Sequence, residues 1–576
     1  MVVEVAAIFR APNGTVSPAP RPDAADSSAT PEAPGNLEFT AAFPGPAPRR
    51  AAHRGRARAL AAASLAILLG VTAAAGLPAL LSPRPADDPG ALAKAGGDAP
   101  ESGGPGLGSP SVAGEGASPG SSGVVPQVVL PSTALPSPTK ATAATDTPPR
   151  TNVPPPSPDR WVATTGSDSA DGSVTRPWRS IQHAVDVTLS GGVITVRAGT
   201  YHGFVVRRSG LVVQGASGES AVVSGGTYVV LVEGVSNATI RHLTIQKAPD
   251  RWGSGIRING SRNVRVENSL VRDNHSFGIK VKDSTGVRVT NNEIRGNDTG
   301  IELSGSVGGT VISGNRIHHN NRMVTSSRGG NGIVFAKTSG LVTVSGNTLW
   351  GNRARHLTDN GYDGGAFEVY ASSNLRITGN IMWDNNNVME TGTDGSAPCS
   401  HINFTRNVAY GPGTVVNETQ GVILRCASSS LIANNTFDGL DTFAFYVTAS
   451  GSFAGSIGGL RIENNIVLRG RIYSLDKGLP GSLVIDHNLD FPGGSTAEYS
   501  DHLAFVEGHG NTDSLAEFRS WTGYDAHGIQ ANPRLADRAK HDYRLRAGSP
   551  AIDAGARIGS AYVGSAPDIG RFERGA

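Results

Sequence analysis

A recurring asparagine constrains the fold of this 576-residue chain more than any other feature of its sequence. A short β-rich run ending in Asn, with an apolar residue one or two places later, occurs nine times at steps of 23 to 33 residues. The nine positions are Asn268, Asn292, Asn315, Asn347, Asn380, Asn407, Asn435, Asn465 and Asn488. Such a period is typical of proteins that stack one structural unit on the next.

Each repeat also has an earlier landmark, a small residue followed by an apolar one, 14 or 15 positions before several of these asparagines. The pairs are Gly278-Ile279, Gly300-Ile301, Gly332-Ile333, Ala366-Phe367 and Gly421-Val422. Each period therefore contains at least two short strands, separated by Gly and Asn turns, with no helical pattern. This predicts an all-β parallel β-helix of about ten coils, with the asparagines in a ladder along one turn. Leucine-rich repeats have a similar period but need a Leu-x-x-Leu-x-Leu pattern, which is absent.

A helical cap precedes the repeats. Within residues 180–185, Ile181, Ala184 and Val185 fall on one face of a helix, and residues 193–196 read as a strand. We expect the helix to close the first coil, because an open end would expose core and strand edges. The predicted β-helix domain covers residues 159–576.

The chain before residue 159 has a different composition. Residues 82–158 hold 17 of the 36 prolines and no aromatic residue, which predicts a disordered linker. Residues 59–81 carry no charge and follow five arginines, so we expect a transmembrane anchor whose N-terminal tail, residues 1–58, is disordered and cytoplasmic. The β-helix domain would then be extracellular. Cleavage as a signal peptide near Ala73, Ala75 or Ala79 is the alternative and would give a secreted protein.

Charge and cysteine content exclude several classes of function. The formal net charge is +2 and no basic stripe with interleaved aromatic residues is present, so nucleic acid is not an expected partner. Two cysteines, Cys399 and Cys426, are too few for a disulfide-rich scaffold or a Cys-based zinc cluster. They form either one disulfide or two buried thiols. We expect a monomer.

Both ends of the predicted domain resemble a known superfamily. Thr165-Gly166-Ser167-Asp168, Pro177-Trp178 and Val196-Arg197-Ala198-Gly199-Thr200-Tyr201 resemble the entry to right-handed parallel β-helix proteins of the pectate lyase superfamily. Ser549-Pro550-Ala551-Ile552-Asp553-Ala554-Gly555 resembles their closing segment. The resemblance implies a right-handed coil, and it leaves the function open because one fold hosts many activities.

Two lengthened turns, residues 318–331 and 353–365, mark the expected binding region, because long loops on a solenoid usually carry function. Alignment of the strands puts Lys280, Glu302, Val334, Glu368, Glu390 and Ile423 in one outward column. Glu368 and Glu390 should lie on adjacent coils, about 4.8 Å apart at the backbone. Two carboxylates that close require a shared proton or a cation. We expect Glu302 to be an ordinary solvated carboxylate.

Residues 360–367 and 383–390 resemble the calcium site of polysaccharide lyase family nine, which has an Asn-x-Asp-Gly loop and a Trp-Asn-x-x-Asp-Asp-Gly-x-Asp run. By position, the resemblance implies Ca²⁺ ligands at Asp363, Asn386, Asn387 and Glu390. The family's catalytic lysine falls near Arg425. Here Asn replaces Asp at two ligand positions, which lowers the expected affinity for calcium, and arginine is a poor base. Substitute bases are Lys337, His356 and Tyr370.

Three functions use these residues. A lyase would neutralise a uronate carboxylate with Ca²⁺ or Arg425, and a base would remove the C5 proton. A retaining glycoside hydrolase would use Glu368 and Glu390 as nucleophile and acid/base. A non-catalytic module would bind a cell-wall glycan. A polysaccharide lyase is slightly favoured, and His318 and His319 are expected to be surface residues rather than metal ligands.

Overall fold

The computed structural model describes residues 159–249, 252–322, 330–353, 364–411, 419–491 and 502–575. The expected tail at 1–58, membrane span at 59–81 and linker at 82–158 lie outside these ranges. None of the helices that the structure describes combines the length and the apolar character needed to cross a bilayer.

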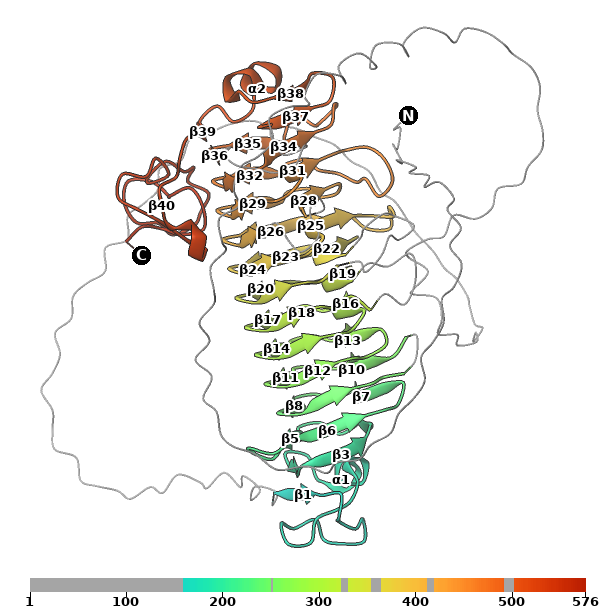
Figure 1. The fold of residues 1–576 in the computed structure, drawn as a ribbon. Helices are drawn as coiled ribbons and strands as arrows, with labels where there is room; N and C mark the ends of the chain where they lie inside the picture. The colour runs from blue at the N-terminus through green and yellow to red at the C-terminus, as the bar shows by residue number, and fades with distance from the viewer. Residues whose placement is uncertain are drawn as a thin grey trace, which may run out of the picture. The chain divides into compact units, whose positions relative to one another are not determined.

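The chain forms a parallel β-helix in which three sheets run the length of the stacked coils (Figure 1). Each regular coil contributes one strand to each of the three sheets. We call these sheets C, A and B, in the order in which the chain passes through them in each coil. Each sheet has thirteen strands, so the solenoid is longer than the ten or so coils expected from the repeat. The strand of sheet B that completes each coil is three or four residues long in most coils, so each period contains three strands where the sequence predicted at least two.

Sheet C contains the longest strands. They are β4 (Phe204–Val206), β7 (Tyr228–Glu233), β10 (Ser254–Asn259), β13 (Phe277–Lys282), β16 (Thr299–Ser306), β19 (Asn331–Ser339), β22 (Gly365–Tyr370), β25 (Asn387–Gly392), β28 (Gln420–Leu424), β31 (Phe443–Val447), β34 (Arg471–Leu475), β37 (Ala504–Val506) and β38 (Gly510–Thr512). All neighbours pair in parallel except β37 and β38.

Sheet A follows sheet C in each coil. Its strands are β1 (Arg160–Val162), β2 (Val193–Val196), β5 (Val212–Gly215), β8 (Thr239–Arg241), β11 (Arg265–Glu267), β14 (Arg288–Thr290), β17 (Thr310–Ser313), β20 (Val342–Ser345), β23 (Ser373–Thr378), β26 (Ser400–Thr405), β29 (Leu431–Ala433), β32 (Arg461–Glu463) and β35 (Val484–Asp486).

Sheet B completes each coil. Its strands are β3 (Gly199–His202), β6 (Ala221–Ser224), β9 (Thr244–Gln246), β12 (Leu270–Arg272), β15 (Glu293–Arg295), β18 (Arg316–His318), β21 (Thr348–Trp350), β24 (Ile381–Trp383), β27 (Val408–Tyr410), β30 (Thr436–Asp438), β33 (Ile466–Leu468), β36 (Leu489–Phe491) and β39 (Ile529–Gln530). The apolar residues of all three sheets that point inward form one continuous core, whose burial supplies the main driving force for stacking.

The predicted asparagine ladder is present in the turn between sheets A and B. From Asn292 onward, each asparagine donates through Nδ2 to the Oδ1 of the asparagine one coil later, at 2.9–3.1 Å, as far as Asn488. The prediction that Asn268 is the first member of the ladder is wrong. It is exposed and occupies the left-handed turn position at φ 49°, and Ser269 takes the ladder position beneath Asn292.

A second ladder, which the sequence pattern did not predict, lies at the other end of the sheet B strands. Asn274, Asn297, Asn320, Asn352 and Asn385 are linked by the same amide-to-amide bonds at 2.9–3.0 Å. Both ends of β15, β18 and β21 are thereby tied to the next coil by amide-to-amide bonds. Because each amide also bonds to backbone groups, these ladders satisfy buried polar groups at the corners.

Short helices lie at the two ends of the solenoid. The cap helix α1 spans Ile181–Val187, with Ser180 as its N-cap and Ile181, Ala184 and Val185 buried, which confirms the prediction. At the other end lies α2 (Leu515–Thr522), followed by η2 (Arg538–Lys540) and the antiparallel pair β40 (Leu535–Asp537) and β41 (Asp542–Leu545). Arg538 and Tyr543 bond to the buried carboxylate of Asp438 in β30, which holds this closing segment against sheet B.

Cys399 and Cys426 form a disulfide. Both sulfurs are buried, and the bond joins the start of β26 to the residue that follows Arg425. Of the two alternatives left open by the sequence, the structure has the bridge.

Candidate functional site

The outward column predicted on sheet C is present in the predicted register. Lys280, Glu302, Val334, Glu368, Glu390 and Ile423 are direct partners on successive parallel strands. Glu368 in β22 is thus opposite Glu390 in β25. The strand pairing brings two carboxylates from different coils onto the same surface.

Glu302, two strands before Glu368, is not the solvated carboxylate that we expected. Its side chain is only 5% exposed and lies 2.7 Å from Lys280 Nζ on the preceding coil. Lys280 Nζ also lies 4.3 Å from the centre of the Phe277 ring. This buried ion pair is a structural contact, and removal of either partner would leave an uncompensated buried charge.

Glu390 has a cationic partner. Arg425, which follows β28, places Nη1 2.8 Å from Glu390 Oε1. The two side chains are 31% and 25% exposed, so water reaches the pair. The backbone N–H groups of Arg425 and Cys426 both donate to Thr391 Oγ1, and the adjacent disulfide fixes the same segment. The cation expected between the two carboxylates is therefore supplied by Arg425, at least for Glu390.

Glu368 has a different partner. Asn331, at the start of β19, donates from Nδ2 to Glu368 Oε2 at 2.7 Å, and its Oδ1 accepts the backbone N–H of Gly365. Asn387 donates a longer bond of 3.4 Å to Glu390 Oε2. A guanidinium stabilises an ionised carboxylate more strongly than a neutral amide does. Among the described contacts, Glu368 thus has an amide partner, whereas Glu390 has a guanidinium and a more distant amide.

Lys337 and Tyr370 lie on the same sheet. Lys337 is the extra residue of a β-bulge, since Ala336 pairs with Ser304 and Thr338 with Gly305. A bulge redirects a side chain, and Lys337 Nζ reaches Asp394 Oδ2 at 2.7 Å and lies 6.0 Å from the centre of the Tyr370 ring. The hydrogen bond from Lys337 holds the pKa of Asp394 well below its usual range. Tyr370 also packs edge-on against Phe453.

The proposed calcium ligands are only partly described. Asp363 lies outside the described residues, as does His356. Asn387 Oδ1 is buried and receives no hydrogen bond from the described part of the chain, which suits a cation ligand. Glu390, however, is bonded to a guanidinium, which would repel a calcium ion. These donors do not fit Ca²⁺ as they stand, and no chemical step below depends on it.

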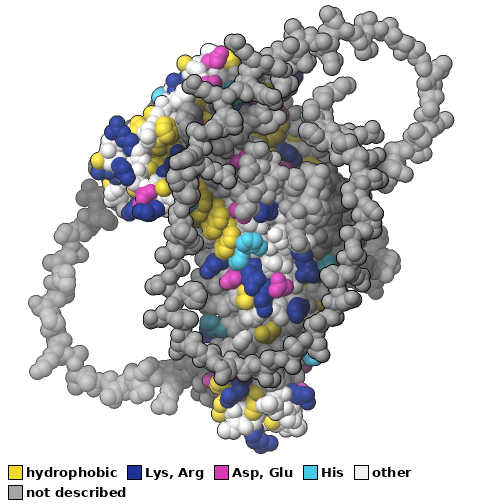
Figure 2. Space-filling view, viewed as in Figure 1, with side chains coloured by type: hydrophobic (Ala, Val, Ile, Leu, Met, Phe, Trp, Pro, Cys, Tyr) yellow, Lys and Arg dark blue, Asp and Glu magenta, His cyan; other side chains and the backbone are white. Residues whose placement is uncertain are grey.

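His318 is not a surface residue. It is buried and stacks at 3.9 Å on Trp350. Along sheet B, Trp350 stacks on Trp383, and Trp383 stacks on Tyr410. Burial lowers the pKa of His318 to about 4. His319 occupies a left-handed turn at φ 51°, and its Nδ1 lies 2.9 Å from that of His318, so the two rings lie next to each other. Figure 2 shows a hydrophobic strip that ends at histidine side chains, with basic and acidic groups beyond them.

Neither the stacked rings nor two hollows in the surface add a sugar-binding area to the site at Glu368 and Glu390. Each stacked ring covers the face of its neighbour, so the faces that would bind a sugar are already used. A hollow of about 420 Å³ lies beside Phe491, Arg534 and Arg538, and another of about 480 Å³ lies beside residues 214–219. Glu368 and Glu390 line neither of them.

Sequence reasoning missed Asn331 and Asp394, which hold Glu368 and Lys337. Asn331 directly precedes the Gly332-Ile333 landmark, and Asp394 stands in a Thr-Asp-Gly turn after β25. Both positions could have been singled out by extending the column alignment at either end of each strand. Their roles could not, because the contacts cross 37 and 57 residues of sequence.

Comparisons with known proteins agree with the geometry of the sheets. Residues 203–388 match the family model described as "Right handed beta helix region". The uncharacterized protein YwoF of Bacillus subtilis (strain 168) is 24% identical over 447 residues, which cover 68% of this chain and 91% of that protein.

Two solved structures are among those similar to this chain. Pectate lyase Pel9A is 16% identical, with a TM-score of 0.40, and the match covers 72% of this chain and 97% of that one. An alginate lyase from Paenibacillus sp. str. FPU-7 is 17% identical, with a TM-score of 0.34, and the match covers 49% of this chain and 94% of that one. At this similarity the likeness concerns the fold alone. The three parallel sheets make this chain a parallel β-helix protein, and residues 203–388 of it match the right-handed family of that fold.

Proposed function

We propose that the face of sheet C that carries Glu368 and Glu390 cleaves a polysaccharide by glycoside hydrolysis with retention of configuration. The observation that supports this proposal is the direct pairing of Glu368 with Glu390 on adjacent coils, each with a different partner. Adjacent parallel strands lie about 4.8 Å apart. Retaining enzymes separate their two carboxyl groups by about 5–5.5 Å.

The ion pair between Arg425 and Glu390 supports an assignment of the roles. Glu390, held ionised by Arg425, would attack the anomeric carbon and form a glycosyl-enzyme bond. Glu368, opposite Glu390 on the adjacent strand, would carry the proton that passes to the leaving glycosidic oxygen. In the second step, Glu368 would take a proton from water as the water attacks the same carbon and releases Glu390.

β-Elimination on a uronate polysaccharide is the second candidate. The position of Lys337 beside Tyr370 favours it, since a lysine and a tyrosine on one surface could supply the base. Arg425 would then bind the uronate carboxylate. Hydrolysis ranks first because Arg425, Lys337 and Arg353 each already pair with a carboxylate of the protein, which leaves them less suited to an acidic sugar.

A panel of neutral and acidic polysaccharides, incubated with the full chain, separates these functions. Hydrolysis yields new reducing ends without ultraviolet absorbance and persists in chelator, whereas elimination yields an unsaturated, absorbing product. We expect Glu390→Gln and Glu368→Gln each to lower the cleavage rate by about 10²–10⁴-fold. Glu233→Gln, on β7 of the same sheet, is the matched control and should keep full activity.

Other outcomes would overturn the proposal. Full activity in either carboxylate variant removes the assigned roles. Glycan binding without any change in polymer length would indicate a non-catalytic binding protein. An absorbing product lost in chelator would support the calcium-dependent lyase instead.

We also propose that residues 59–81 anchor the chain in the plasma membrane with its N-terminus in the cytoplasm, so that the β-helix meets its polysaccharide outside the cell. The support is the uncharged 23-residue run and the arginines before it.

A further inference from the structure

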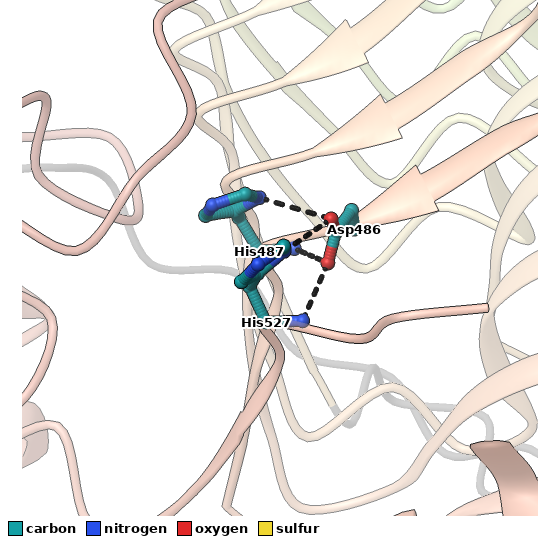
Figure 3. Close-up of side chains that lie close together, drawn as sticks. All are labelled: Asp486, His487 and His527. Carbon is teal, nitrogen blue, oxygen red and sulfur yellow. Dashed lines mark hydrogen bonds and ion pairs between the residues drawn. The ribbon is translucent and has the colours of Figure 1, made fainter.

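A second cluster of chemically reactive side chains lies at the C-terminal end of the solenoid (Figure 3). Asp486 ends β35, and His487 follows it directly. His527 lies in the segment between α2 and β39, about 40 residues later. One nitrogen or oxygen atom from each of the three side chains lies within 4.8 Å of the other two.

Both oxygens of the Asp486 carboxylate contact neighbouring groups. Its Oδ1 accepts the backbone N–H groups of His487 and His527 at 2.9 and 2.8 Å. Its Oδ2 lies 2.7 Å from His527 Nδ1 and 3.4 Å from His487 Nδ1. The two imidazole rings stack 4.6 Å apart at an angle of 21°. Figure 3 shows both rings beside the one carboxylate.

Anchoring of the segment after α2 explains the contacts of Asp486 Oδ1 but not those of Oδ2. The hydrogen bond from the His527 N–H attaches the segment after α2 to the last coil, the one from the His487 N–H lies within the turn, and neither needs a particular side chain at 487 or 527. His487 occupies the left-handed turn position, at φ 53°, that earlier coils fill with Asn464, Asn434 and Arg406. The turn therefore does not require histidine. The convergence of two imidazoles on the second carboxylate oxygen remains to be explained.

We propose that Asp486, His487 and His527 bind one divalent transition-metal ion, for which Zn²⁺ is the best match. Imidazole nitrogen and carboxylate oxygen are zinc ligands at about 2.0–2.2 Å. Three such ligands in a tetrahedral site lie about 3.3 Å from one another, so the side chains need only small adjustments. The side chain of His527 is 66% exposed and free to make them, and water can fill the remaining position.

The surrounding contacts suit a metal site. The hydrogen bonds from two backbone N–H groups fix the carboxylate in place, as groups around metal ligands usually do. The same segment is held from the inside by Asp525, which accepts hydrogen bonds from the Asn488 N–H and the Tyr473 hydroxyl. A bound ion would join the last coil to this segment. β35 belongs to sheet A, so the site is separate from the carboxylates of sheet C and does not depend on the proposed hydrolysis.

The test is zinc binding by the full, tag-free chain after treatment with chelator, measured by calorimetry with ZnCl₂. We expect one Zn²⁺ per chain, and at least a tenfold loss of affinity in His487→Ala and in His527→Ala. His502→Ala is the matched control, because His502 pairs with Asp513 at 2.8 Å at the same end of the fold without belonging to the cluster. Its affinity should not change.

A second readout is thermal unfolding. Zinc should raise the Tm of the unaltered chain and of His502→Ala, and should leave the Tm of the His487→Ala/His527→Ala double variant unchanged. Both histidine variants keep the two backbone bonds to Asp486, so the segment should still fold. No zinc binding by the unaltered chain, or undiminished binding by the double variant, would overturn the proposal.

Discussion

Arg425 illustrates how one residue can change the chemistry assigned to a site. It lies near the place where the resembled lyase family has its catalytic lysine, where we expected it to be a poor base, and the structure pairs it with Glu390 at 2.8 Å. A guanidinium stays protonated, so it cannot accept the C5 proton in this state. What it can do is hold a neighbouring carboxylate ionised.

Replacement of Arg425 should therefore move a pH profile as well as lower activity. In Arg425→Ala, Glu390 loses its cationic partner and becomes ionised at a higher pH, so the acidic limb of kcat/KM should shift upward. Arg425→Lys keeps the positive charge and should shift the limb less. The measurement is kcat/KM against pH on the best polysaccharide substrate. An unshifted acidic limb in Arg425→Ala would contradict the assigned role.

Asp490 is a second residue whose environment could not be read from the sequence. It occupies the inward position of β36, where the preceding coils carry Val467, Phe437 and Ala409. Its carboxylate is buried, and neither oxygen has a hydrogen-bond partner in the described part of the chain. Burial raises the pKa of Asp490 to about 8, and burial raises that of nearby Asp525 to about 6.

The contribution of Asp490 to the stability of the fold should therefore fall as the pH rises. The folded chain keeps a proton on Asp490 that the unfolded chain releases above a pKa of about 4. Between about pH 4 and pH 8 the folded state binds more protons, so its stability decreases over that window and levels off above it. Asp490→Asn removes this dependence. We expect the difference in Tm, variant minus unaltered chain, to increase as the pH is raised from 5 to 8. Parallel Tm profiles would contradict the buried, protonated carboxylate.

At the scale of elements, short sheet B strands are secured by polar ladders and stacked rings rather than by their own length. The asparagine ladders connect adjacent coils on both sides of strands such as β24. His318, Trp350, Trp383 and Tyr410 stack over the outer surface of the same strands. The first ladder was predictable because its asparagines recur with the repeat. The asparagines of the second ladder lie five residues after those of the first. The second ladder was not predicted, because the three-residue strand between the two has too little alternation to be recognised.

The ladder predicts different costs for two asparagines of the same motif. Asn380 donates from Nδ2 to Asn407 Oδ1, and its own Oδ1 accepts from Asn347, all in the buried interior. Asn380→Ala leaves these groups unpaired and should lower the free energy of unfolding by about 1–3 kcal/mol or more. Asn268→Gly removes an exposed side chain at a left-handed turn position that glycine adopts readily, and should change it by less than about 0.5–1 kcal/mol. Denaturant unfolding monitored by circular dichroism measures both. Equal losses would mean that the ladder is not a stabilising element.

At the scale of the whole molecule, the β-helix is one part of a chain whose first 158 residues have a different composition. Seventeen of the 36 prolines lie in residues 82–158, the predicted linker. The disulfide between Cys399 and Cys426 is consistent with an oxidising compartment. These features bear on where the protein acts, separately from the chemistry of sheet C.

The anchor is testable by fractionation. The full chain expressed in its native type of cell should remain in the membrane fraction after alkaline carbonate washing, and external protease should cut it within residues 82–158. Deletion of residues 59–81 removes the export signal and should leave the chain in the soluble cytoplasmic fraction. Recovery of the unaltered chain from the medium, with its N-terminus near residue 80, would indicate a cleaved signal peptide and a secreted protein.

The sequence by itself determined the parallel β-helix, its cap helix, the main asparagine ladder and the outward register of Glu368 and Glu390. These follow from local periodicity, because inward and outward residues alternate along each strand and the repeat fixes which strands are neighbours. Only the tertiary structure decided which side chains meet. Arg425 with Glu390, Asn331 with Glu368 and His527 with Asp486 are contacts between segments about 35 to 41 residues apart. Such contacts depend on how each turn directs its side chains, and the repeat does not encode that direction.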